Sequence, residues 1–161
     1  QIDPEAFVHP DCTIIGNVVI GAGSTIWPQA VLRGDQSRIV VGERTSVQDG
    51  SVLHCTRHLE TIVGSDVTIG QLAHLEGCTV EDGALIGTGS VVLHNAIVRS
   101  GALVGAGAVV PNGMEVPSGA MALGVPAKLK LGAVNPAQVT FPAEEYVRNC
   151  ARYRAELRRI D

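Results

Sequence analysis

The chain has 161 residues, with 12 lysines and arginines against 16 aspartates and glutamates, and a formal net charge of −4. This length suits one domain with a sizeable core, and the nearly balanced charge argues against a nucleic-acid partner. The opening Gln-Ile-Asp-Pro is unlike a signal peptide, and no apolar run approaches the ~20 residues that a membrane span needs. We therefore expect no membrane partner.

The four cysteines form no C-x-x-C pair and show no disulfide-like spacing; they are Cys12, Cys55, Cys78 and Cys150. Such a pattern contains no zinc ribbon. Buried free thiols in a reducing, cytoplasmic setting are the expectation.

An aliphatic residue recurs about every six positions between Ile14 and Ala127, usually followed by Gly or a small polar residue. Neither a helix, with a period of about 3.6, nor an ordinary strand, with a period of about 2, repeats in this way. A six-residue period is typical of a parallel β-helix, in which three units make a triangular coil of about 18 residues. We therefore predict an all-β, parallel β-helix over residues 1–127. The clearest run of inward positions is Val80, Ile86, Val92, Val98, Val104, Val110 and Val116.

A different element follows the repeat. Residues 128–141, which contain Gly132 and Pro136, are predicted to form a linker. Residues 142–161 are predicted to form an amphipathic helix that begins near Pro142. This helix either packs along its own prism or helps to bind a neighbouring subunit. Its apolar stripe comprises Tyr146, Cys150, Tyr153, Leu157 and Ile160.

Two breaks in the six-residue register mark the candidate site, because function is often placed where a regular scaffold is interrupted. The first break is a loop at residues 54–60, and it begins with His54. The second break is a missing position within residues 69–80. That shortened segment contains Gln71, His74 and Glu76.

Short segments around these breaks occur in a fixed order. They are V-L-R-G-D at 31–35, V-Q-D-G-S-V-L-H at 47–54, V-T-I-G at 67–70, G-C at 77–78 and G-V-P-A-K at 124–128. Together they resemble the γ-class carbonic anhydrase family over most of the chain, from about Ala6 to Lys128. The last segment is the least specific, since hexapeptide acyltransferases carry similar tails.

The resemblance implies a left-handed β-helix that assembles as a homotrimer and holds zinc between subunits with three histidines. The first of these positions is His54, whereas the other two are occupied by Gln71 and Glu76. His54 and Glu76 remain acceptable zinc ligands, but the amide of Gln71 is a weak donor for this metal. The resemblance therefore indicates an altered zinc site.

The resemblance also assigns residues around the metal. Family counterparts of Arg33 and Asp35 form ionic links across the subunit interface, and those of Gln48 and Asp49 line the pocket. For Arg33, Asp35 and Asp49 we expect a role in trimer contact rather than in catalysis.

Geometry gives an independent reason for a site between subunits. Five extended steps from Gln71 to Glu76 cover roughly 16 Å, too far for both side chains to reach one ion within a prism. His74 shares a face with Glu76 if the strand is regular, but the missing position leaves its direction open. His9 and His94 have no ligand context in the sequence, and His58 lies in the loop.

Several functions remain open. The leading hypothesis is a carbonic anhydrase-like protein acting on CO2 or bicarbonate, with weak or absent hydration because its ligands are altered. A second is a metal-free enzyme that uses His54, Glu76 and His74 as acid–base groups on another small substrate. A third is a non-catalytic scaffold or binding subunit. Acyl transfer is more distant, because Lys128 and Lys130 offer little basic pocket.

Overall fold

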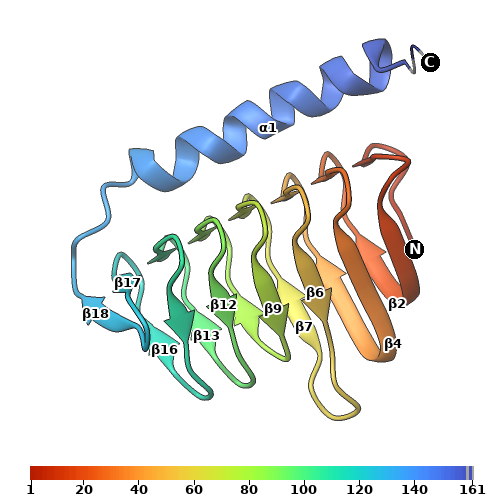
Figure 1. Cartoon of the computed structure of the whole chain (residues 1–161). Helices are drawn as coiled ribbons and strands as arrows, with labels where there is room; N and C mark the ends of the chain where they lie inside the picture. The colour runs from red at the N-terminus through yellow and green to blue at the C-terminus, as the bar shows by residue number, and fades with distance from the viewer. Residues whose placement is uncertain (159, 161) are drawn as a thin grey trace.

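The computed structural model describes residues 1–158 and 160, and it shows a parallel β-helix with one long α-helix lying along it (Figure 1). Each coil contributes strands to three faces, and equivalent strands of successive coils pair in parallel. The fold class predicted from the six-residue period is confirmed.

Face 1 is the face over which the helix α1 lies. Its parallel part consists of β1 (Phe7–Val8), β3 (Thr25–Ile26), β5 (Ser46–Val47), β8 (Thr68–Ile69), β11 (Leu85–Ile86), β14 (Leu103–Val104) and β17 (Met121–Leu123). The helix contacts β1, β3, β5 and β8 of this face.

Faces 2 and 3 form one continuous sheet, because two long strands bend around the corner between them; these are β2 (Thr13–Ile20) and β4 (Val31–Val41). The first part of β4 pairs with β6, and its last part pairs with β7. Face 2 continues with β6 (Val52–His54), β9 (His74–Glu76), β12 (Val91–Val92) and β15 (Val109–Val110). Face 3 continues with β7 (Thr61–Val63), β10 (Thr79–Val80), β13 (Ile97–Val98) and β16 (Glu115–Val116).

The core is a set of aliphatic ladders, one inside each face. On face 2, for example, the inward residues Leu32, Leu53, Leu75 and Val92 stack in register and are completely buried. Full burial of such a side chain stabilises the fold by about 1.5–3 kcal/mol. The repeat of small and aliphatic residues therefore fills a narrow interior without aromatic side chains.

The coil length changes at the two predicted breaks. Leu85 pairs with Leu103, 18 residues later, whereas His74 pairs with Val91 after 17 residues. The longer break forms the loop between β6 and β7, which projects from the corner between faces 2 and 3 (Figure 1). Both irregularities therefore lie at the same corner.

The predicted linker and helix boundaries are wrong in detail. Residues 128–130 form β18 (Lys128–Lys130), which pairs antiparallel with β17 at the end of face 1. The helix α1 (Ala137–Glu156) begins five residues before the predicted start and ends before the predicted 161. Residues 159 and 161, at the predicted end, lie outside the described residues.

The early helix start has a local cause. The Asn135 side chain accepts a hydrogen bond from the Ala137 N–H (3.1 Å), and the Gln138 side chain accepts one from the Asn135 N–H (2.9 Å). This reciprocal pair is a capping box, and Pro136 between them already has helical angles of φ −49° and ψ −37°. Pro142 lies inside the helix, where it costs one backbone hydrogen bond.

The helix packs on its own prism, which is one of the two arrangements that the sequence left open. It runs back from the last coil to the first, so that Arg154 donates a hydrogen bond to the backbone oxygen of Glu5 (2.9 Å). Tyr146 and Tyr153 meet Trp27 edge to face, with ring centroids 5.6 and 5.1 Å apart. Leu157 and Ile160, at the end of the predicted stripe, are instead exposed.

Tyr153→Ala should weaken the docking of α1. The change removes ring contacts with Trp27 and Phe7, and each aromatic pair contributes about 0.5–1.5 kcal/mol beyond its buried area. Trp27 is the one tryptophan of the chain, so its fluorescence reports undocking directly. We expect its emission to shift to longer wavelength at a lower denaturant concentration than in the wild type. Phe141→Ala, on the same helix but 63% exposed, is the control and should leave the transition in place.

Candidate functional site

The outward side chains at the end of face 2 form the candidate site. Side chains alternate along β6 and β9, so Leu53 and Leu75 point inward while His54 and Glu76 point outward. In the register between coils, Arg33 lies beside His54, and His54 lies beside Glu76. Residues far apart in the chain are thereby brought into one row.

Glu76 lies among three imidazoles. The His54 Nδ1–H donates a hydrogen bond of 2.8 Å to Oε1 of Glu76, because an ionised carboxylate can only accept. The other oxygen, Oε2, lies 3.4 Å from His74 Nε2 and 3.6 Å from His94 Nε2. We call these four residues the Glu76 cluster.

His74 points outward with Glu76, which resolves the direction that the sequence left open. Leu75 between them is completely buried, so the two flanking side chains share the outer face of β9. His74 thus belongs to the site as predicted from strand alternation.

His94 corrects the sequence interpretation, which gave it no ligand context. The shortened coil turns at Gly77, which has φ +61°, and the Asn95 N–H donates to the Gly77 backbone oxygen (2.7 Å). This bond places the ring of His94 against the corner. The ring lies so close that a Cβ atom, if position 77 had one, would be 3.2 Å from His94 Cδ2. The missing position in the repeat marks this corner in the sequence. The sequence does not show that His94 of the next coil reaches Glu76, because that depends on how the two coils pair.

Asp35 closes the other side of His54. Its Oδ1 lies 3.6 Å from His54 Nε2, and its Oδ2 accepts a hydrogen bond of 2.7 Å from Arg33. That hydrogen bond holds the pKa of Asp35 below its ordinary value. His54 Nε2 is buried and has no hydrogen-bond partner. With the proton on Nδ1, this nitrogen can accept a hydrogen bond that nothing in the chain donates.

Glu76 is held in its ionised form. Burial by itself would raise its pKa, but the hydrogen bonds from His54 and His74 and the nearby charge of His94 outweigh burial. The net result is a pKa below the ordinary value. An ionised Glu76 in turn keeps the proton of neutral His54 on Nδ1 and leaves Nε2 free to accept.

Three other predicted site residues lie at the opposite edge of face 2. Gln71 accepts a hydrogen bond from the Thr88 hydroxyl (2.8 Å), and Asp49 is exposed beside it, where its backbone oxygen accepts from Leu72 (2.9 Å). Gln48 is buried at the same corner. Within one chain these residues are therefore separate from His54 and Glu76, as the extended distance from 71 to 76 predicted.

The zinc site implied by the resemblance does not fit the residues as they stand in one chain. His54 and Glu76 are bonded to each other rather than directed at a shared point. In the part of the chain that the structure describes, no group of three or more His, Cys, Asp or Glu is arranged to hold a metal ion. The unpartnered Nε2 of His54 is one available donor, and a catalytic zinc usually takes three.

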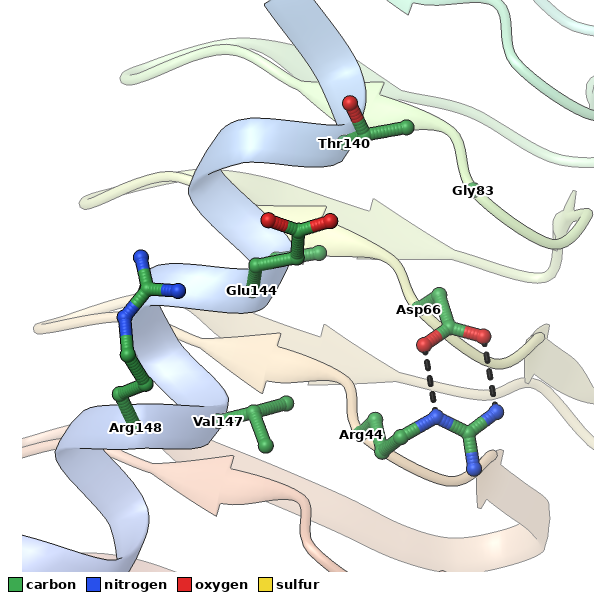
Figure 2. A pocket seen from close by; sticks show the side chains of 8 residues that line it. Arg44, Asp66, Gly83, Thr140, Glu144, Val147 and Arg148 are labelled. Carbon is green, nitrogen blue, oxygen red and sulfur yellow. Dashed lines mark hydrogen bonds and ion pairs between the residues drawn. The ribbon is translucent and has the colours of Figure 1, made fainter. Parts of the chain in front are cut away.

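A separate hollow lies between α1 and the corner that carries Arg44 and Asp66 (Figure 2). It has a volume of about 570 Å³, and Val147 and Ala143 contribute an apolar wall. Arg44 and Asp66 are bonded to each other through two contacts of 2.7 and 2.8 Å. This hollow contains none of the predicted site residues.

Comparison with known proteins supports the same fold. Residues 1–34 match the family model for the bacterial transferase hexapeptide (six repeats). The chain is 35% identical to a hexapeptide transferase family protein from Anaplasma phagocytophilum, covering 95% of this chain and 92% of that one, with a TM-score of 0.91. The chain therefore belongs to the hexapeptide transferase family.

Other relatives carry different functional names. Gamma carbonic anhydrase 1, mitochondrial, of Arabidopsis thaliana is 47% identical over 98 residues, which are 57% of this chain and 36% of that protein. Carnitine operon protein CaiE of Escherichia coli is 43% identical over 95 residues, 59% of this chain and 48% of its own length. The chain thus spans about a third to a half of these curated relatives, which confirm the resemblance to γ-class carbonic anhydrases.

A solved Bacillus cereus protein assigned as an acetyltransferase is 36% identical, covering 96% of this chain and 91% of that one, with a TM-score of 0.92. Among the residues that are described, no helix is both long and apolar enough to cross a membrane.

Glu76→Gln should reduce stability in a pH-dependent way. Because the folded-state pKa of Glu76 is lowered, its contribution is present above the ordinary value of about 4.3 and is lost as the pH falls through the lowered value. Denaturant unfolding of wild type and variant should therefore differ near neutral pH, and the difference should disappear as the pH falls through the lowered pKa of Glu76. Exposed Glu60→Gln is the control. A difference that stays constant with pH would contradict the assignment.

Proposed function

We propose that this chain forms a γ-carbonic anhydrase-like protein in which His54, oriented by Glu76, acts as a metal-independent general base on a small carbonyl substrate. One observation carries the proposal: the 2.8 Å bond from His54 Nδ1 to Glu76 leaves Nε2 buried and unpartnered. A carboxylate that holds an imidazole in this tautomer is the acid–base half of a Ser-His-Asp triad. CO2 hydration would then be weak or absent.

The chemistry follows from the two nitrogens of His54. Nε2 takes a proton from water as the water oxygen attacks the substrate carbonyl, while the Nδ1–H bond to Glu76 stabilises the resulting imidazolium. The bond from the carbonyl carbon to the leaving group then breaks, and the leaving group departs with the electron pair. Asp35 lies across Nε2, so its side chain, which is 38% exposed, has to rotate outward when substrate binds.

Hydrolysis of p-nitrophenyl acetate tests the general base, because the leaving phenolate absorbs light and needs no proton. We expect turnover that persists after metal removal with EDTA, with metal content checked by plasma emission. His54→Gln should lower the rate by about 10²–10⁴, and Glu76→Gln by about 10² or more, since each removes part of the proton-accepting pair.

His58→Gln, in the projecting loop, is the matched control and should keep the wild-type rate. CO2 hydration is measured on the same samples with and without added zinc. Ester hydrolysis that survives His54→Gln, or full hydration activity that appears with zinc, would overturn the metal-independent base.

Acyl transfer is the second candidate, and the extensive likeness to the Bacillus cereus protein favours it. His54 would then remove a proton from an amine rather than from water. Acetyl-coenzyme A supplied with and without a small amine distinguishes the two: a transferase releases thiol only with the amine, whereas a hydrolase needs none.

We also propose that the chain is a homotrimer. α1 covers face 1, whereas faces 2 and 3 present outward aliphatic residues that remain partly exposed in one chain, including Val52, Val91, Ile62 and Ile97. A neighbour packed there would bring its Gln71 edge towards the His54 edge. Light scattering should give three times the chain mass of 16.8 kDa; a monomer at micromolar concentration would remove the shared site.

We also propose that the protein is located in the cytoplasm. Cys12, Cys55, Cys78 and Cys150 are all free, and free thiols are typical of reducing compartments. Mass spectrometry after alkylation of intact cells tests this: disulfide-linked chains would contradict it.

A further inference from the structure

The hollow beneath α1 lies at a corner of the prism that the acid–base residues do not share. Its corner residues Arg44, Asp66 and Gly83 come from three successive coils, between faces 3 and 1. The homotrimer proposed above joins the other two corners, at Gln71 and His54. A ligand site in this hollow is therefore separate from the proposed function and does not depend on it.

Two charged side chains stand at this corner where neighbouring coils have glycine. Gly23, Gly83 and Gly101 occupy the equivalent position with φ between +65° and +67°. Arg44 and Asp66 share this left-handed backbone, with φ +51° and +57°, although residues with a Cβ rarely adopt it. Because the same turn forms with glycine, the turn itself does not require these two side chains. Both of them line the hollow.

The Arg44 guanidinium is already held between two carboxylates. It donates to Asp66 through Nε and Nη2, at 2.7 and 2.8 Å, and to Glu43 through Nη1, at 2.8 Å. Two negative charges thus outweigh one positive charge at this corner. An anion that approached Arg44 would be repelled by both carboxylates.

Helix α1 adds a further carboxylate on the opposite side of the hollow. The side chain of Glu144 has no hydrogen-bond or ion-pair partner among the residues that the structure describes. Arg148 is bonded to Glu145 at 2.6 Å and points away from the corner residues (Figure 2). The two sides together contribute four carboxylates and two guanidinium groups. This surplus of negative charge favours a cation as the ligand.

The wall of the hollow is apolar, and its size suits a small molecule. Ala143 is buried and Val147 half-buried, and Figure 2 shows Val147 pointing towards the Arg44–Asp66 pair. The three corner coils span roughly 10 Å, because coils lie about 4.8 Å apart. The volume of about 570 Å³ lies within the range of about 300–1,000 Å³ that is typical of small-molecule sites.

We propose that this hollow binds an amphiphilic organic cation, which is an ammonium group on an aliphatic or aromatic body. The ammonium group donates a hydrogen bond to the Glu144 carboxylate, which is exposed and keeps the charge close to water. The apolar body lies against Ala143 and Val147 and extends along the corner. A neutral ligand gains only the apolar contact, and an anion meets the surplus of carboxylates.

Isothermal titration calorimetry with n-alkylammonium ions from hexyl to decyl, below their micelle concentrations, tests the site. Affinity should rise by up to about fourfold for each added CH2 that is buried. Octylammonium should bind about tenfold more tightly than 1-octanol, because a hydrogen bond to a charged group adds to the same apolar contact. Octanoate should bind most weakly. Titration at two temperatures ensures that a heat near zero at one of them is not read as absence of binding.

Glu144→Gln tests the charged end of the site. The variant should lose the roughly tenfold preference for octylammonium over 1-octanol, since the amide is neutral, but it should keep its affinity for the alcohol. Glu156→Gln, at the other end of α1, is the matched control and should keep the preference. Circular dichroism and Trp27 fluorescence check that α1 is folded and docked in each variant.

Gly83→Asn tests the apolar end. A Cβ at Gly83 would meet no atom within 4 Å, and asparagine tolerates its backbone angle of φ +66° better than most residues. The new side chain would stand in the row of Arg44 and Asp66 and take up space in the hollow. Binding of both octyl ligands should weaken by about tenfold, the loss expected when one or two CH2 groups leave the site. Gly101→Asn, one coil further with φ +65° and equally open space, should leave binding unchanged.

Each other outcome overturns the proposal. An affinity that does not change with chain length would indicate an ion pair at the surface without a hollow to bury the chain. Octylammonium binding that survives Gly83→Asn, or that Gly101→Asn weakens equally, would place the ligand elsewhere. Tighter binding of octanoate than of octylammonium would make the site anionic in preference, and no heat with any ligand at either temperature would show that the hollow binds none of them.

Discussion

The parallel register between coils is the constraint on which the rest of the structure depends. Each residue of a face lies beside its equivalent in the next coil, so the chain can build a row of side chains from positions that lie one whole coil apart in the sequence. The row Arg33, His54, Glu76 is a direct product of that register. If one coil is longer or shorter than the others, the residues at its corner therefore shift relative to the row of Arg33, His54 and Glu76.

The shortened coil shows the effect. Because it turns one residue early at Gly77, the following coil presents His94 against Glu76. A carboxylate now lies among imidazoles, at a place where the related carbonic anhydrases are expected to have a histidine facing a metal. The ionised Glu76 thus accepts hydrogen bonds from the imidazoles of His54 and His74, whereas a cation would bind their unprotonated nitrogens.

The sequence predicted the fold well because the hexapeptide period repeats many times and each unit carries the same physical information. It also placed His54 and Glu76 in one site, because each lies at a break in that period. The sequence did not predict the contact of His94 with Glu76. That contact depends on how the shortened coil pairs with the next coil, and the residues next to His94 in the sequence do not indicate it. The helix start differs for another reason: the sequence offers two prolines, and the helix begins after Pro136, where Asn135 and Gln138 form the cap, rather than near Pro142.

The reversed strand β18 limits how far the prism can extend. A parallel β-helix adds coils by offering the unpaired backbone of its last coil to another strand, and a second molecule could in principle supply it. On face 1 that backbone is already occupied by a strand running the opposite way, with exposed Lys128 and Lys130 along it. Two such ends would bring the like charges of Lys128 and Lys130 together. On face 1, β18 therefore occupies the edge of the last coil that another parallel coil would need.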